Sequence, residues 1–309
     1  MIQERLKALR AEMEKRGITV YVVPTADFHE SEYVGDHFKA RKFITGFTGS
    51  AGTAVITLDE AGLWTDGRYF VQAENQLKDS TVTLYRMGEE GVPTADEFVK
   101  DRLKEGGCLG FDGRVVNGTW GGKLEKIAAE KNVSMHVTED LIDLIWEDRP
   151  ALSKQPLFIL EEKYSGKSTA DKIADLRKAM KENGADVHIL TSLYDIAWLL
   201  NIRGNDIDYV PVVLSYLVLN ETECIWFLQE EVVDDKIRAY LEENHITTKP
   251  YDAIYDYVPE IPADAVVLMN RGTVNSRIVN SLDKAIKVVD KPNPTELRKA
   301  VKNTTEVDN

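Results

Sequence analysis

The chain has 309 residues, of which 43% are hydrophobic and 29% are charged, a composition typical of folded globular proteins rather than disordered ones. It carries 38 basic and 52 acidic residues, and the resulting net charge of −14 argues against nucleic acid and anionic membranes as partners, because like charges repel. The two cysteines, Cys108 and Cys224, match no disulfide or metal-site spacing, so we expect reduced thiols and a cytoplasmic protein.

The first predicted element is an amphipathic helix in the opening sequence MIQERLKALRAEMEKRG. Its apolar residues Leu6, Leu9 and Met13 recur at helical spacing, and the charged residues between them exclude a signal peptide. The most apolar stretch of the chain, VPVVLSYLVL from Val210, is too short to cross a bilayer and contains Pro211. We therefore expect no membrane-spanning segment.

The two halves of the chain repeat one pattern. The stretch LRAEM before Gly17 matches LRKAM before Gly184, and a glycine at such a position typically ends a helix. Each copy then enters a strand, and later shows two apolar runs joined by a polar turn, TAVITL with LWT and VVLSYLVL with CIWFL. The shared order of elements indicates a duplication.

The join between the halves lies in WEDRPALSKQP, where Pro150 and Pro156 bracket a polar stretch. We place one domain at residues 1–150 and a second at residues 151–291. Helices and strands alternate in each half, which predicts the α/β class: two tandem, similar domains, each a mixed β-sheet flanked by helices. The sheets are mixed because the strand pairs require antiparallel neighbours.

Residues 292–309 open a further helix. Asn293 is a suitable N-cap, Pro294 occupies the first helical position and Glu296 completes a capping-box pattern. An apolar stripe follows at helical spacing, formed by Leu297, Ala300, Val301 and Thr304. We expect such a stripe to pack against another part of the protein, either the second domain or a third domain that the sequence does not include.

The loop Gly46–Gly52 has glycines at every third position, followed by a strand and then by Arg68. Phosphate-binding loops lead into a helix, whereas this loop leads into a strand, so we predict a tight turn with close backbone packing. Arg68 follows an Asp-Gly pair and begins a helical segment. Its planar guanidinium suits a peptide carbonyl or carboxylate, and the alternative is an ion pair with a nearby acidic residue.

Two other segments carry polar groups that could act in binding. His29 lies in DFHESEYVGDH, which is either a divalent-ion site or a polar loop with a hydrogen-bonded histidine. Arg203 and Asp206 follow a predicted helix that begins after Ser192, and we predict that they form a structural ion pair rather than a catalytic dyad. No nucleophile with an adjacent base is apparent, so the residues by themselves do not describe a complete enzyme.

Four stretches resemble one family. Asp27–Tyr33, Gly46–Ala54 and Trp64–Phe70 resemble the first domain of aminopeptidase P, the Xaa-Pro aminopeptidases in their long three-domain form. Asp195–Asp206 is similar to the second domain of that family. Creatinase and prolidase share the architecture, but the glycine loop and the WTDGRYF run look most like aminopeptidase P.

The resemblance implies a role for these domains beside a catalytic third domain. That domain holds two divalent metals, commonly manganese, through Asp, Asp, His, Glu and Glu, and cleaves the bond before a proline in the second position of a peptide. This sequence ends where that domain begins, so we expect no catalytic residue, no metal ligand and no cofactor in this chain, and no activity from it alone. Residues 292–309 then correspond to the start of the entry helix of the catalytic domain.

The resemblance also implies one site residue and several partners. Arg68 corresponds to a substrate-binding arginine, and we list His29 and Arg203 as further candidates to face the substrate. The expected partners are the catalytic domain, peptides with proline in the second position and a second copy of the chain. The expected role of this region is to shape the substrate entrance, to limit access to short peptides and to support dimerisation.

Two alternatives remain open from the sequence. The chain could be a stand-alone peptide- or protein-binding module of the same fold. It could also be a fragment of a creatinase-type amidinohydrolase, which acts on another substrate.

Overall fold

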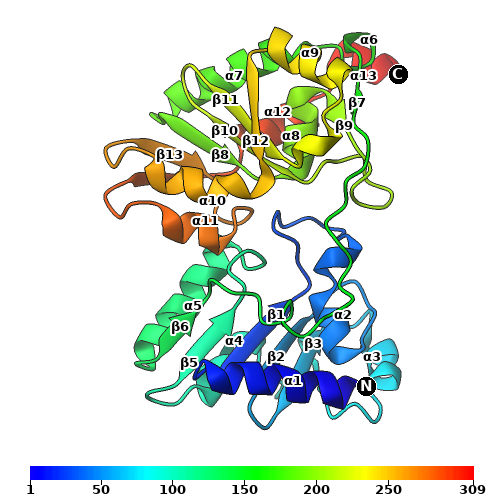
Figure 1. Ribbon diagram of the computed structural model, residues 1–309, viewed down its shortest axis with the longest axis vertical. Helices are drawn as coiled ribbons and strands as arrows, with labels where there is room; N and C mark the ends of the chain where they lie inside the picture. Colours follow the sequence, from blue (N-terminus) through cyan, green and yellow to red (C-terminus); the bar gives the residue numbers. More distant parts are fainter. The chain divides into compact units, whose positions relative to one another are not determined.

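A computed structural model describes residues 1–309 and divides them into two units, each built on a six-stranded sheet (Figure 1). Unit 1 comprises Met1–Phe28 and Asp36–Ala151, and unit 2 comprises His29–Gly35 and Leu152–Asn309. The short segment His29–Gly35 thus belongs to unit 2, although the surrounding sequence forms unit 1.

The sheet of unit 1 has the strand order β4-β3-β2-β1-β5-β6. Only β2 runs against its neighbours, because it pairs antiparallel with both β1 and β3 while the remaining pairs are parallel. The strands are β1 (Val20–Pro24), β2 (Thr53–Thr57), β3 (Ala61–Thr65), β4 (Thr83–Arg86), β5 (Cys108–Phe111) and β6 (Ser134–His136).

Helices cover both faces of this sheet, because successive strand residues point to opposite faces and both sets are apolar. One core cluster packs Leu6, Leu9 and Met13 against Ala54 and its neighbours, and the cluster on the other face includes the tryptophan of β3. The helices are α1 (Ile2–Lys15), α2 (Ala40–Thr45), α3 (Phe70–Gln76), α4 (Ala95–Arg102) and α5 (Gly118–Glu130), with a 3-10 turn η1 (Asp36–Phe38).

Unit 2 repeats this topology with the order β12-β11-β10-β8-β13-β14, in which only β10 is antiparallel to its neighbours. The strands are β8 (Val187–Leu190), β10 (Ser215–Leu219), β11 (Cys224–Leu228), β12 (Ile246–Pro250), β13 (Val266–Met269) and β14 (Lys287–Asp290), and β7 (Phe158–Ile159) pairs separately with β9 (Ile202–Arg203). The predicted α/β class and the two similar mixed sheets are therefore confirmed.

The helices of unit 2 also follow the repeat, since α7 precedes β8 in the way that α1 precedes β1. Gly17 and Gly184 follow these two helices with φ of +67° and +62°, the left-handed geometry that makes glycine the usual helix terminator. The helices are α6 (Glu162–Ser165), α7 (Thr169–Glu182), α8 (Leu193–Leu200), α9 (Asp235–Glu243), α10 (Ile254–Tyr257), α11 (Ser276–Ser281), α12 (Pro294–Ala300) and α13 (Thr304–Asp308), with 3-10 turns η2 (Glu230–Val232), η3 (Tyr251–Ala253) and η4 (Val258–Glu260).

The final segment differs from the single helix expected from its stripe. Helix α12 ends at Ala300, and α13 begins anew because the Asn303 side chain accepts a hydrogen bond from the backbone of Glu306, whose carboxylate in turn accepts one from Asn303. The segment docks on unit 2 by polar contacts, while Leu297 and Val301 stay 73% and 66% exposed.

Candidate functional site

The main candidate site lies at one edge of the unit 1 sheet. Strands β1, β3 and β5 run in the same direction, so their carboxyl ends meet at this edge. Strand β2 runs the other way and therefore begins there, with Thr53 opposite both Pro24 and Trp64. The glycine loop, which enters β2, and Arg68, which follows β3, are thereby brought to the same edge.

A buried arginine that the sequence analysis did not single out organises the glycine loop. Arg41 is only 3% exposed, and its guanidinium donates hydrogen bonds to the carbonyl oxygens of Phe47 (2.5 Å) and Gly49 and to the hydroxyl of Thr25 (2.9 Å). It also lies 4.7 Å from the centre of the Phe47 ring. Burial lowers the pKa of Arg41 to about 10, so the group is still charged at neutral pH.

Two glycines of the loop are required by the structure, Gly46 by its backbone conformation and Gly49 by close packing. Gly46 ends α2 with φ of +79°. A β-carbon at Gly49 would lie 2.2 Å from the Phe47 ring, a distance that no side chain tolerates. The close backbone packing predicted for this loop is therefore present, and it brings the Gly49 carbonyl within reach of Arg41.

Arg68 is held by its own turn and exposed to solvent. Its Nε and Nη2 donate to the two carboxylate oxygens of Asp66, both at 2.8 Å, and its backbone N–H donates to Asp66 Oδ1 at 3.1 Å. This ion pair lowers the pKa of Asp66 to about 2. The Arg68 side chain remains 70% exposed and lies over the Tyr69 ring at 5.1 Å.

The loop and the arginine are joined by α3. The hydroxyls of Ser50 and Tyr69 are 2.6 Å apart, and the backbone N–H of Thr48 donates to the Gln76 side chain at 2.8 Å. Ser50, Arg68 and Tyr69 thus form one continuous surface, which we call the Arg68 cluster. Sequence reasoning found Arg68 but not Ser50, whose place depends on the folded loop.

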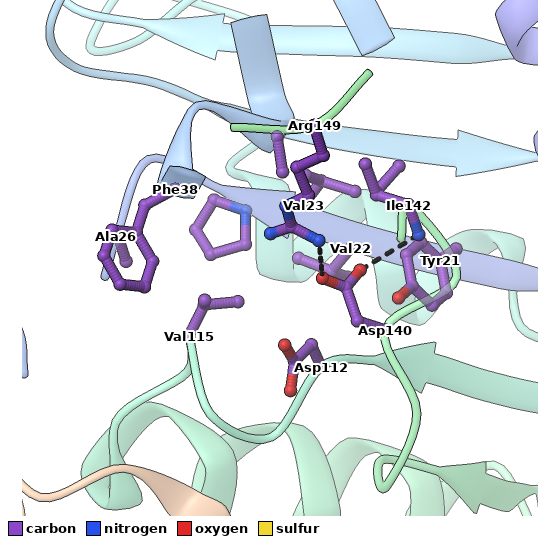
Figure 2. Close-up of a pocket in the computed structure, with 12 residues that line it drawn as sticks. Tyr21, Val22, Val23, Ala26, Phe38, Asp112, Val115, Asp140, Ile142 and Arg149 are labelled. Atoms are coloured by element: carbon purple, nitrogen blue, oxygen red, sulfur yellow. Dashed lines mark hydrogen bonds and ion pairs between the residues drawn. The ribbon is translucent and has the colours of Figure 1, made fainter. Parts of the chain in front are cut away.

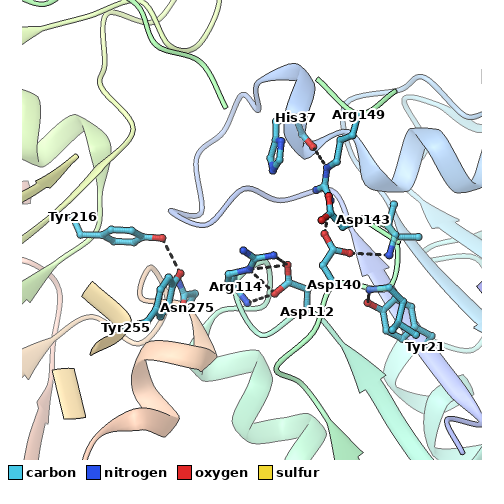
Figure 3. Close-up of polar contacts among 12 residues, drawn as sticks. Tyr21, His37, Asp112, Arg114, Asp140, Asp143, Arg149, Tyr216, Tyr255 and Asn275 are labelled. Atoms are coloured by element: carbon cyan, nitrogen blue, oxygen red, sulfur yellow. Dashed lines mark hydrogen bonds and ion pairs between the residues drawn. The ribbon is translucent and has the colours of Figure 1, made fainter. Parts of the chain in front are cut away.

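The tripeptide Asp-Gly-Arg occurs a second time at the same edge, after β5. Arg114 donates to Asp112 through its backbone N–H (2.9 Å), Nε (3.0 Å) and Nη2 (3.0 Å) (Figure 3). Arg68 binds Asp66 through the same three groups. The Arg114 pair is more buried, with the Asp112 side chain 4% exposed and the Arg114 guanidinium 4.4 Å over the Phe28 ring. A search for repeated tripeptides would have revealed this echo in the sequence.

A small cavity of about 10 Å³ lies next to Asp112, with Asp140 and Arg149 in its wall (Figure 2). Arg149 binds Asp140 at 2.6 Å, and both side chains are less than a tenth exposed. Burial raises the pKa of Asp112 despite the neighbouring Arg114. A volume of this size accommodates about one water molecule and no substrate, so we regard this buried cluster as structural.

His29 is placed inside unit 2, where it is 2% exposed. Its Nδ1 lies 3.1 Å from the carbonyl oxygen of Thr191, which can only accept, so Nδ1 carries the proton. In the neutral ring Nε2 then accepts a hydrogen bond from the Tyr251 hydroxyl at 2.6 Å. The ring also packs on Tyr216 at 4.5 Å between centres. A substrate contact for His29 stays a prediction.

Arg203 and Asp206 do not form the predicted ion pair. Arg203 instead donates to the carbonyl oxygens of Ala197 and Ile202, and burial lowers its pKa. Asp206 accepts from the backbone N–H groups of Gln155 (3.1 Å) and Leu214 (2.9 Å). The prediction was wrong because carbonyl groups in the last turn of α8, such as that of Ala197, lack helical partners and accept hydrogen bonds from the Arg203 guanidinium instead. A substrate-facing role for Arg203 stays a prediction.

The structure contains no group of three or more His, Cys, Asp or Glu side chains placed to hold a metal ion. None of its helices has the length and apolar character needed to cross a membrane.

Comparison with known protein families gives matches over both units. Residues 5–145 and residues 148–306 each match a family model described as the creatinase/prolidase N-terminal domain. The chain is 38% identical to a probable Xaa-Pro aminopeptidase P of Neurospora crassa, over 99% of this chain and 46% of the relative. It is 35% identical to aminopeptidase P2 of Arabidopsis thaliana, over 92% of this chain and 41% of the relative.

Among solved structures, the chain is similar to an X-prolyl aminopeptidase from Caenorhabditis elegans, described as a cytosolic enzyme with a di-nuclear active site. The TM-score is 0.93 at 31% sequence identity, over all of this chain and 52% of that one. The chain therefore spans about half the length of the relatives that it matches.

Proposed function

Because the chain belongs to the creatinase/prolidase N-terminal domain family, we propose that it is the non-catalytic N-terminal region of a metal-dependent Xaa-Pro aminopeptidase. Such an enzyme removes the residue that precedes a proline at the start of a peptide. The observation that carries the proposal is the similarity to the Caenorhabditis elegans enzyme over the whole chain, with a TM-score of 0.93. We extend to this chain the cytosolic location described for that enzyme.

In this proposal the metal chemistry belongs to the rest of the protein. The residues of this chain do not fit a di-nuclear metal centre, since no group of potential ligands is gathered anywhere in it. We place two divalent metals, with manganese as the expected element, in a catalytic part that this chain adjoins. The chain's own residues would bind and orient the peptide, limit access to short peptides and support pairing of two copies.

Arg68 is the residue that we assign to peptide binding. Asp66 occupies the Nε and Nη2 edge of its guanidinium, so the Nη1 edge is left to meet a carbonyl or carboxylate oxygen of the peptide. Val71, three residues further along the chain in the first turn of α3, is 73% exposed. An exposed apolar residue close in sequence to the cation suits a peptide that presents both a polar backbone and a proline ring.

The test is the turnover of Xaa-Pro peptides by the whole protein after Arg68→Ala. We expect kcat/KM to fall about tenfold to a hundredfold, the effect of losing one hydrogen bond to a charged group, while the fold is retained because the side chain is exposed. Arg102→Ala is a matched control, since Arg102 is also a surface arginine that binds an acidic residue and lies over an aromatic ring.

The control variant should keep wild-type turnover. Equal kcat/KM values for Arg68→Ala and the wild type at low substrate concentration would remove Arg68 from the site. A whole protein without any Xaa-Pro aminopeptidase activity would contradict the proposed function itself.

A further inference from the structure

We propose that the Arg68 cluster, with Arg41 beneath it, binds the C-terminal carboxylate of a short peptide. This inference rests on the proposed function, because it names the part of the peptide substrate that reaches this edge of unit 1. It concerns the binding of an anion by Arg68, Ser50 and Tyr69, and it assigns no chemical step to them.

The first argument comes from the free edge of Arg68. Arginine has five N–H groups, and Asp66 takes the one on Nε and one on Nη2. The remaining edge presents parallel N–H groups from Nη1 and Nη2, and the structure gives them no acceptor. Two parallel N–H groups match the two oxygens of a carboxylate better than the single oxygen of a carbonyl. Asp66 fixes the guanidinium in the orientation that this binding needs.

The second argument comes from the charge of Arg41. Arg68 is paired with Asp66, and the nearby Arg86 is paired with Glu74 at 3.3 Å. Arg41 binds only neutral groups, two carbonyls and one hydroxyl, so its positive charge is not compensated. In a chain with a net charge of −14, the groups around the glycine loop, which are Arg41 and these two ion pairs, therefore carry one uncompensated positive charge. Such an excess favours an anion over a neutral carbonyl.

The third argument follows from the geometry of the peptide bond. In a trans peptide the C=O and the next N–H point in opposite directions. Because Arg41 holds the carbonyl of Gly49, the N–H of Ser50 points away from Arg41. Ser50 is exposed, and its N–H has no acceptor in the structure, while its hydroxyl lies 2.6 Å from that of Tyr69. The buried cation thus polarises a peptide unit whose donor is directed outward.

These groups are contiguous through Tyr69. The Tyr69 ring lies 5.1 Å from the Arg68 guanidinium, and its hydroxyl meets Ser50. An anion at this surface would therefore meet a planar cation on one side and a neutral N–H and hydroxyl on the other. A short peptide carries one such anion at its C-terminus, and the amide of the same peptide lacks it. This difference makes the proposal testable with two nearly identical ligands.

The first experiment measures KM of the whole protein for one Xaa-Pro-Xaa tripeptide as the free acid and as the C-terminal amide. We expect KM to be about tenfold lower for the acid in the wild type, equal for acid and amide in Arg68→Ala, and partly different in Arg68→Lys. Arg102→Ala should keep the full tenfold difference. Equal KM values in the wild type, or a preference that survives Arg68→Ala, would overturn the carboxylate site and leave the proposed function standing.

The second experiment does not depend on catalysis. Nuclear magnetic resonance of the 309-residue chain follows the Ser50 amide and the Arg68 Nε–H during titration with the tripeptide acid, the amide and inorganic phosphate. We expect saturable shifts with the acid alone, and their loss in Arg68→Ala. Shifts that are absent with the acid at millimolar concentration, or equal for the acid and the amide, contradict the site. Saturation by phosphate in place of the acid also contradicts it, since the anion bound would then be of another kind.

Discussion

At the scale of single residues, three arginines differ in how far their guanidinium groups are exposed to solvent. Arg41, Arg68 and Arg114 all belong to the same edge of unit 1, but Arg41 is buried and Arg114 is partly buried, while Arg68 is 70% exposed. The Asp-Gly-Arg turn locks Arg68 and Arg114 in the same way, so the tripeptide alone does not decide their function. Exposure of the second guanidinium edge is what makes Arg68 available to a ligand.

The packing of the glycine loop can be tested at Gly49. Gly49→Ala places a β-carbon 2.2 Å from the Phe47 ring, and we expect the free energy of unfolding to fall by roughly 1–3 kcal/mol, the usual effect of overpacking. Gly122→Ala is the control, because its β-carbon meets no atom within 4 Å in the interior of α5, and alanine favours a helix over glycine. Urea unfolding measures both, and a Gly49→Ala variant as stable as the wild type would contradict the packing described here.

Lys172 is a second residue with a measurable expected effect, since its contribution to the free energy of unfolding should depend on pH. It is 2% exposed and donates to the Trp198 carbonyl (2.8 Å) and the Asn201 side chain (2.7 Å). Burial lowers its pKa from 10.5 to about 8. Between these two values the unfolded chain binds more protons than the folded one, so the stabilising contribution of Lys172 rises with pH.

We therefore predict how the wild type compares with Lys172→Met in urea unfolding. The difference in the free energy of unfolding should shift in favour of the wild type by roughly 2 kcal/mol between about pH 7 and about pH 9.5. Because all other titrating groups are common to both proteins, their effects cancel in this difference. A difference that stays constant over this pH range would mean that the pKa of Lys172 is not lowered.

At the scale of elements, α8 shows how the end of the chain is fastened to unit 2. Near its first turn, the buried carboxylate of Asp195 accepts hydrogen bonds from Lys299 (2.6 Å) and Asn293 (3.2 Å). Near its last turn, Lys172 and Arg203 donate to carbonyl groups that have no partner within the helix. Helix α12 is thus held by polar groups, and its apolar side chains Leu297 and Val301 remain exposed.

The attachment of α12 can be tested by removing its lysine. Lys299→Met leaves the carboxylate of Asp195, which is 1% exposed, without its cation, and breaking a buried pair is strongly destabilising. Lys299 itself is a third exposed, so we expect a smaller loss of roughly 1–3 kcal/mol in the free energy of unfolding. Lys181→Met, which breaks the exposed pair with Glu221, should change stability by less than about 0.5 kcal/mol. Equal effects of the two substitutions would argue against the attachment.

At the scale of the whole molecule, the chain is a repeat of one fold with different surfaces. Both sheets have the same strand order and the same single antiparallel strand, yet only unit 1 carries the glycine loop and the two Asp-Gly-Arg turns. Neither unit gathers the carboxylate and histidine side chains that a metal centre requires. The fold is thus shared, whereas the glycine loop and the Arg68 cluster occur in only one of its two copies.

From this we predict that the purified 309-residue chain does not release the first residue of Xaa-Pro peptides when manganese is added. The physical reason is that no group of its residues fits a metal centre. The whole protein, assayed under the same conditions, serves as the positive control. Metal-dependent release by the chain, retained after repeated purification, would contradict the proposal that the catalytic metal centre lies outside this chain.

The sequence by itself determined the features that depend on near neighbours. The amphipathic α1, the glycines that end α1 and α7, the strand pairs, the α/β class and the repeat were all read from local patterns. The helical segment after Arg68 also followed from its neighbours, although α3 begins two residues later than expected, at Phe70. These predictions held because helix caps, turns and strand pairs are set by residues a few positions apart.

The tertiary structure decided what depends on residues far apart in the chain. It assigned His29–Gly35 to unit 2, buried His29 against Thr191 and Tyr251, and gave Arg203 and Asp206 separate partners. It also set Arg41 under the glycine loop, and it left Arg114 partly buried but Arg68 exposed in the same tripeptide. Burial and charge balance arise only when distant segments pack together, so no local pattern could have revealed them.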